Sequence, residues 1–166
     1  MEQSVSLRLP KVSVIVITHN GKRHLRECFE SLAKQTYKDF EAYLLDNGST
    51  DGSSEFVREN FPWVKIIRFE KNYGFAEGYN RAIKMVNTEY VALLNDDTKV
   101  DPKWLEELVK AIESDESIFT VGSKILFYDR PDTINHAGAK ITIIGAGIDI
   151  GLSLIHISEP TRPLYI

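Results

Sequence analysis

The chain has 166 residues, with 20 Lys and Arg against 24 Asp and Glu, and its net charge is −4 at neutral pH. Its 43% hydrophobic and 27% charged residues are ordinary for a globular domain, which excludes disordered and collagen-like proteins. The slightly negative balance argues against a nucleic-acid partner, because such a partner requires a basic face. The single cysteine excludes an intrachain disulfide and a zinc site built from several cysteines.

Targeting and membrane signals are weak along the whole sequence. No apolar run approaches the ~20 residues of a membrane-spanning helix. The first ten residues, MEQSVSLRLP, lack the apolar core of a signal peptide. We therefore expect a cytoplasmic protein without a transmembrane segment, which leaves room for peripheral membrane association of the full-length protein.

Strand and helix patterns then alternate. Residues 12–18 (VSVIVIT) are apolar at nearly every position, which is typical of a strand covered on both faces. A helical pattern follows Asn20, which we expect to cap that helix. Its apolar face is formed by Leu25, Cys28, Phe29 and Leu32. Further strands are predicted over residues 40–45, 64–69 and 90–94. One helix is predicted over residues 54–60, a second follows residues 72–76 and continues to Val86, and a third runs from Asp101-Pro102 to Ile112.

This alternation predicts an α/β fold with a doubly wound, mostly parallel sheet. Residues 118–121 are a candidate fifth strand, and the pattern weakens from about Asp129. The segment 152–166 fits nothing before it. It resembles translated sequencing adapter at the end of a truncated reading frame, with an ordinary C-terminal tail as the alternative. We therefore expect the domain to occupy residues 1–151.

Polar residues follow three predicted strands, at Thr18-His19-Asn20, Asp46-Asn47-Gly48-Ser49 and Asn95-Asp96-Asp97. In a parallel sheet these ends meet at one edge, where open α/β sheets bind their ligands. Adjacent carboxylates repel a diphosphate, whereas a divalent cation between them attracts both. The sequence therefore predicts a nucleotide diphosphate bound through Mg²⁺ or Mn²⁺, with a solvated turn as the alternative.

Three other side chains have two interpretations each. Asp46 accepts hydrogen bonds from a base or ribose, or else it orders its own Asp-Asn-Gly turn. His19 contacts a phosphate, or else it orders the loop after the first strand. Cys28 lies on an apolar helix face, so we interpret it as a core residue and not as a nucleophile.

Several segments together resemble a known family. They are residues 12–20 (VSVIVITHN), 28–32, 35–37, 45–52 (LDNGSTDG), 72–80 (NYGFAEGYN) and 93–98 (LLNDDT). In order and spacing they resemble glycosyltransferase family 2, the inverting GT-A enzymes, over roughly residues 10–151. Gly74-Phe75-Ala76 and Asn95-Asp96-Asp97 are similar to the rhamnosyltransferase-like branch. The resemblance implies a Rossmann-like GT-A fold, truncated on its C-terminal side.

The resemblance also implies roles for particular residues. Thr18 and Asp46 would line the pocket for the base and ribose, and Asp96 would approach the ribose or diphosphate. Asp97 would bind the metal, as the last residue of a motif usually written D-x-D. Asn95 replaces the first Asp of that motif and lowers the local charge. The remaining residues implied in the nucleotide-sugar site are His19, Asn20, Gly48, Gly74, Gly78 and Asn80.

The implied reaction is inverting, metal-dependent transfer of a sugar from a nucleotide-diphosphate sugar to a saccharide or lipid-linked acceptor, as in polysaccharide assembly. The family's general base is a carboxylate downstream of the metal motif. Asp115-Glu116 and Asp149 do not suit that role, so we expect the base beyond this chain. Two alternatives stay open: a non-catalytic nucleotide-binding fragment, and a nucleotidyltransferase, which would usually carry a Gly-rich basic loop after its first strand.

Overall fold

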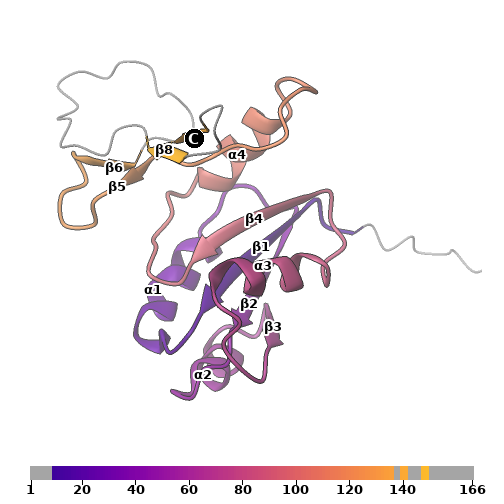
Figure 1. The fold of residues 1–166 in the computed structure, drawn as a ribbon, viewed down its shortest axis with the longest axis vertical. Coiled ribbons are helices and arrows are strands. Elements are labelled where there is room, and N and C mark those ends of the chain that lie inside the picture. The colour runs from indigo at the N-terminus through magenta and orange to yellow at the C-terminus, as the bar shows by residue number, and fades with distance from the viewer. Residues whose placement is uncertain (1–8, 137–138, 142–146, 150–166) are drawn as a thin grey trace, which may run out of the picture. The chain divides into compact units, whose positions relative to one another are not determined.

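The computed structural model describes residues 9–136, 139–141 and 147–149 (Figure 1). The chain divides into two compact units, Met1–Pro102 and Lys103–Ile166. In the first unit strands and helices alternate, as the sequence predicts: β1 (Val12–Thr18), α1 (Lys22–Ala33), β2 (Phe40–Asp46), α2 (Ser53–Asn60), β3 (Val64–Arg68), α3 (Phe75–Ile83) and β4 (Tyr90–Asn95).

The four strands form one parallel sheet in the order β3-β2-β1-β4. The chain steps outward from β1 to β3 and then returns to place β4 on the other side of β1 (Figure 1). Because of this reversal, the topological switch point of the sheet lies between the paired strands β1 and β4. Ligands of such sheets bind at this point, beyond the carboxyl ends of the strands. The register places Thr18 beside Asp46 and Ile17 beside Asn95.

Both faces of β1 are covered, which explains why its sequence is apolar throughout. On one face Ile15 and Ile17 belong to a core cluster that also contains Tyr43, Leu45, Ile67, Tyr79 and Ala82. Val12, Val14 and Val16 point to the opposite face and are at most 1% exposed. β4 is instead an edge strand, and its Leu93 is 46% exposed.

Some predicted details differ from the structure. Gly21, and not Asn20, is the N-cap of α1, and the Asn20 side chain instead accepts a hydrogen bond from the Thr50 amide. α3 ends at Ile83 instead of Val86. The helix predicted from Asp101-Pro102 begins instead at Trp104, with Lys103 as its N-cap. Residues 118–121 form no strand.

The second unit contains α4 (Trp104–Ile112) and two antiparallel strand pairs. β5 (Ile125–Leu126) pairs with β6 (Ile134–His136), and β7 (Ala139–Ile141) pairs with β8 (Gly147–Asp149). The predicted non-native segment 152–166 lies outside the described residues. Within the described residues, no helix has the length and apolar character needed to cross a membrane.

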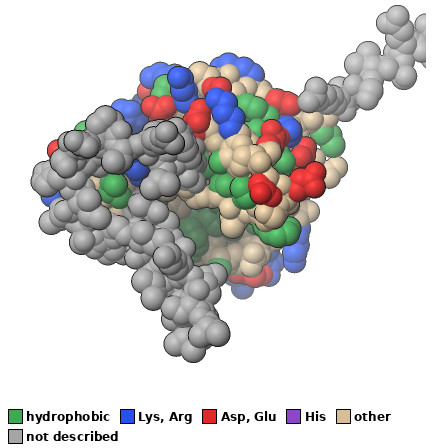
Figure 2. Space-filling model, turned by 90° about the horizontal axis from the view of Figure 1, so that it is seen from above, with side chains coloured by type: hydrophobic (Ala, Val, Ile, Leu, Met, Phe, Trp, Pro, Cys, Tyr) green, Lys and Arg blue, Asp and Glu red, His purple; other side chains and the backbone are tan. Residues whose placement is uncertain are grey.

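Charged side chains of both signs are interspersed over the coloured part of the face in Figure 2. Within the first unit, Lys65 pairs with Glu41, and Arg68 pairs with Glu55. A pair in which both side chains are exposed, such as Arg68 with Glu55, contributes little to stability, about 1 kcal/mol or less. The stability of the first unit therefore comes mainly from its buried sheet.

Candidate functional site

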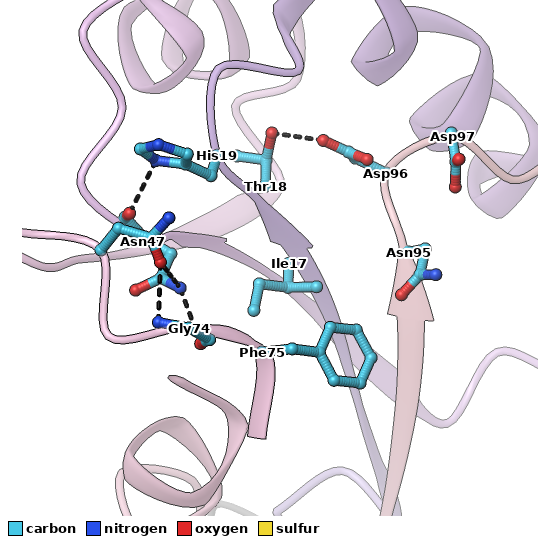
Figure 3. A pocket seen from close by; sticks show the side chains of 10 residues that line it. Ile17, Thr18, His19, Asn47, Gly74, Phe75, Asn95, Asp96 and Asp97 are labelled. Carbon is cyan, nitrogen blue, oxygen red and sulfur yellow. Dashed lines mark hydrogen bonds between the residues drawn. The ribbon is translucent and has the colours of Figure 1, made fainter. Parts of the chain in front are cut away.

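A pocket of about 310 Å³ opens at the carboxyl ends of β1, β2 and β4, beside the topological switch point (Figure 3). Its volume lies within the range of small-ligand sites in proteins. It is lined by Ile17, Thr18, His19, Asn47, Asn72, Gly74, Phe75, Asn95, Asp96 and Asp97. The pocket thus combines residues from the ends of three strands and from the loop before α3.

Asp96 is held in place from the end of β1. The Thr18 hydroxyl donates a hydrogen bond of 2.5 Å to Asp96 Oδ2 and accepts one of 3.2 Å from the Gly21 amide. A Cβ atom at Gly21 would lie 1.8 Å from Asp96 Oδ2, so the glycine leaves room for the carboxylate. Burial, together with the charge of Asp97, raises the pKa of Asp96 above its ordinary value, although the Thr18 hydrogen bond opposes that rise.

Two adjacent carboxylates, Asp96 and Asp97, lie in this pocket. Among the described residues, neither Asp96 nor Asp97 forms an ion pair with Lys or Arg. In that same part of the chain, no group of three His, Cys, Asp or Glu side chains could hold a metal ion. Mg²⁺ typically binds one or two carboxylates and completes its shell with substrate phosphates and water. Asp96 and Asp97 fit a metal shared in that way with a phosphate ligand.

Asn47 connects the loop after β2 to the loop before α3. Its Nδ2 donates to the Gly74 carbonyl at 2.9 Å and to Asn72 Oδ1 at 3.0 Å. Its Oδ1 accepts a hydrogen bond of 3.0 Å from the Tyr73 amide. Because both the nitrogen and the oxygen of its side-chain amide form hydrogen bonds, Asn47 fixes the position of residues 72–74 along the pocket wall.

His19 lies on the same side of the pocket as Asn47 (Figure 3). Its Nδ1 lies 3.0 Å from the Asn47 carbonyl oxygen. A carbonyl can only accept, so Nδ1 carries the hydrogen of this contact, and Nε2 is an acceptor whenever the ring is neutral. His19 therefore orders the loop and also offers one acceptor to a ligand.

The structure brings together six of the residues singled out from the sequence: Thr18, His19, Gly74, Asn95, Asp96 and Asp97. Asp46 does not line the pocket, since it is 1% exposed. Its carboxylate accepts hydrogen bonds from the Ser49 amide at 2.8 Å and from the Ser54 hydroxyl, and Arg68 Nε lies 3.7 Å away. These contacts match the alternative role of Asp46, which is to order its own loop.

Four more predicted residues lie outside the pocket lining. The Asn20 side chain accepts a hydrogen bond of 2.8 Å from the Thr50 amide. Gly48 has φ of 77°, and a Cβ there would lie 2.5 Å from the Lys71 carbonyl carbon, so it allows two loops to meet. Gly78 is buried, and its Cβ would lie 3.1 Å from Asn47 Nδ2. Asn80 is exposed on α3.

The site assigned from the sequence omitted four residues that line the pocket: Ile17, Asn47, Asn72 and Phe75. A signal for Asn47 was present, because side chains alternate along a strand, so the residue after Asp46 points to the other face. Ile17 and Phe75 are apolar, and polar clusters alone could not identify them. Cys28 is fully buried, and burial raises the pKa of its thiol to about 12, which confirms it as a core residue.

Comparison with known proteins finds glycosyltransferases among the relatives of this chain. GlyG of Streptococcus pneumoniae, described as a glycosyltransferase, is 30% identical over 126 residues, which cover 73% of this chain and 41% of GlyG. YibD of Escherichia coli, an uncharacterized glycosyltransferase, is 32% identical and is covered over 37% of its length. This chain therefore spans less than half of either relative.

Two solved structures share the fold. S. aureus TarS in complex with UDP-GlcNAc is 30% identical with a TM-score of 0.57, over 63% of this chain and 31% of that one. The mannosyltransferase PcManGT of Pyrobaculum calidifontis, in complex with GDP-Man and Mn²⁺, is 26% identical with a TM-score of 0.61, over 72% of this chain and 36% of that one. The predicted GT-A-like α/β fold with a parallel sheet is confirmed.

The family described as Glycosyl transferase family 2 matches residues 13–157, which is most of the sequence. The motifs within that range supply the pocket residues at the ends of β1 and β4. This chain belongs to glycosyltransferase family 2.

Proposed function

We propose that this chain holds the donor and metal site of an inverting transferase that moves a sugar from a nucleotide-diphosphate sugar to a saccharide or lipid-linked acceptor. The observation that carries the proposal is the pair Asp96 and Asp97, which lies without a cation partner among the described residues. A diphosphate with its divalent cation neutralises such a pair, whereas a diphosphate alone would be repelled.

The structural relatives support this ligand class. TarS has been solved with UDP and with UDP-GlcNAc, and PcManGT with GDP-Man and Mn²⁺. We assign Mn²⁺ or Mg²⁺ to Asp97 and place the diphosphate or ribose near Asp96. Bound there, the metal would offset the negative charge that develops on the leaving nucleoside diphosphate.

The other pocket residues divide into ligand contacts and supports. We assign His19 Nε2 as an acceptor for a hydroxyl or N–H group of the nucleoside, because Nδ1 is already engaged by Asn47. Thr18 supports Asp96, since its hydroxyl hydrogen is committed to that carboxylate. Asp46 supports the loop that carries Asn47. We propose a rhamnosyltransferase-like donor, on the similarity of the Gly74-Phe75-Ala76 segment.

Inverting transfer needs a general base that takes the proton of the acceptor hydroxyl. The only carboxylates among the described residues that line the pocket are Asp96 and Asp97, which we assign to the donor side. We therefore propose that the base belongs to a segment outside the described residues.

The cytoplasmic location stays a prediction.

Isothermal titration of UDP, dTDP and GDP into the chain, with and without Mn²⁺, tests the donor site. We expect one nucleotide to bind in a Mn²⁺-dependent manner. Asp97→Asn, which keeps the side-chain shape and removes the charge, should weaken that binding by about tenfold or more. Asp115→Asn is the matched control, because Asp115 is an exposed carboxylate that does not line the pocket.

Two results would contradict the proposal. One is folded wild-type protein that binds none of the three nucleotides in either condition. The other is equal, metal-independent binding by the wild type and Asp97→Asn.

A further inference from the structure

An exposed aromatic ring lines the otherwise polar donor pocket. Phe75, the first residue of α3, is 62% exposed. The other described lining residues are hydrogen-bonding side chains, apart from Gly74 and Ile17, and Ile17 is only 8% exposed. An exposed phenylalanine ring lacks the stabilisation that burial of an apolar side chain provides. Aromatic side chains in ligand pockets commonly supply the apolar contact surface.

The Phe75 ring is held in a defined position. It packs on Tyr79 in an edge-to-face arrangement, with ring centroids 5.0 Å apart and an interplanar angle of 87°. Tyr79 is itself 4% exposed, and its hydroxyl donates to the Leu94 carbonyl at 2.8 Å. On the backbone side, the preceding residue Gly74 is fixed by the hydrogen bond from Asn47 Nδ2 to its carbonyl.

This arrangement leaves a flat surface open. In an edge-to-face pair, one ring presents its edge to the face of the other, so Tyr79 covers at most one face of Phe75. At least one face is therefore free of Tyr79. A ring that is already ordered loses little conformational entropy when a ligand packs on it.

The position of the ring indicates which part of the donor it contacts. Figure 3 shows Phe75 directed toward Asn95 at the end of β4, with His19 and Asn47 on the opposite side of the pocket. We have assigned the nucleoside to the His19 side and the diphosphate to Asp96 and Asp97. The group attached to the far end of the diphosphate is the sugar.

We infer that Phe75 is a platform for the sugar ring of the donor and thereby contributes to donor specificity. This inference rests on the proposed function. One face of a pyranose presents several C–H groups, which pack against the electron-rich face of an aromatic ring, while its hydroxyls reach polar partners at the ring's rim. The Asn95 amide, on the side toward which Phe75 points, is suited to bind such hydroxyls.

The test compares each nucleotide with its sugar-bearing form. UDP and UDP-GlcNAc, GDP and GDP-mannose, and dTDP and dTDP-rhamnose are titrated with Mn²⁺ into the wild type, Phe75→Ala and Phe75→Tyr. We expect Phe75→Ala to bind the nucleotide like the wild type and the preferred nucleotide sugar about tenfold more weakly. Phe75→Tyr, which keeps the ring, should restore the affinity. Phe119→Ala is the control, because Phe119 is 92% exposed and does not line the pocket.

The other outcomes separate the two proposals. Equal weakening of nucleotide and nucleotide sugar by Phe75→Ala would mean that the ring contacts the base or supports the fold, and it would overturn the inference alone. Unchanged binding of both would also overturn it alone. If the wild type binds no nucleotide, the proposed function fails and the inference fails with it.

Discussion

The two ends of the parallel sheet both carry clustered polar side chains, but among the described residues only one cluster contains a Lys or Arg ion pair. At the amino end, Glu41 Oε1 accepts hydrogen bonds from the Ser13 hydroxyl at 3.1 Å and the Tyr43 hydroxyl at 2.6 Å. The Lys65 ammonium pairs with Glu41 Oε2, and Thr88 donates to Ser13. Every charge in that cluster has an opposite charge or a donor beside it.

At the carboxyl end, Asp96 has one hydroxyl donor and a second carboxylate as its neighbour. The pKa values of the carboxyl groups at the two ends are therefore shifted in opposite directions. Although burial opposes it, the hydrogen bonds from Lys65, Tyr43 and Ser13 lower the pKa of Glu41, whereas burial and Asp97 raise the pKa of Asp96. The cluster around Glu41 is therefore paired within the sheet, whereas Asp96 and Asp97 are the carboxylates to which we assign the metal.

The largest expected effect comes from the loops that build the carboxyl end. In Gly48→Ala, a Cβ 2.5 Å from the Lys71 backbone would add to the cost of a left-handed φ. We expect a loss of about 3 kcal/mol of unfolding free energy, measured by urea titration. Gly52→Ala is the control: its φ of 80° is similar, but its closest neighbour is Lys22 Nζ at 3.4 Å. It should lose only about 1 kcal/mol, and equal losses in the two variants would contradict the prediction.

A smaller effect is expected at Thr18, which links β1 to the carboxylates. Thr18→Val keeps the shape but leaves the Gly21 amide without its hydroxyl acceptor and frees Asp96. The unfolding free energy should fall by about 1–2 kcal/mol in the same urea titration. Thr18→Ser, which keeps the hydroxyl, should recover most of it. If Thr18→Ser is no more stable than Thr18→Val, the hydroxyl is not the cause.

The smallest effect is expected at the amino end. Glu41→Gln removes the charge opposite Lys65, whose side chain is 60% exposed, and should cost about 1 kcal/mol or less at neutral pH. Folding lowers the pKa of Glu41, so its stabilisation is present above its unfolded pKa of about 4.3 and disappears as the pH falls through the folded value.

Urea titrations of the wild type and Glu41→Gln from pH 7 to pH 3 measure this effect, and the two curves should converge at the acid end. Mn²⁺-dependent nucleotide binding at neutral pH should be the same in both proteins. A variant that lost this binding would show that the two ends of the sheet are not separate in function.

Local patterns in the sequence determined much of the fold. The continuous apolar run of β1 requires cover on both faces, and the spacing of Leu25, Cys28, Phe29 and Leu32 requires one buried helix face. Such patterns depend only on near neighbours along the chain. The ends of the elements were less predictable, because a residue such as the N-cap Gly21 lies against Asp96, which is distant in the sequence.

The sequence by itself also predicted that Thr18, Asp96 and Asp97 lie at one edge of the sheet, because the carboxyl ends of parallel strands meet there. Only the tertiary structure decided which side chains face the pocket. Asp46 and Asn47 are neighbours in the chain, yet Asp46 turns into its own loop while Asn47 spans to residues 72–74. The physical reason is that hydrogen bonds between loops distant in sequence select these orientations, and no pattern along the chain records those partners.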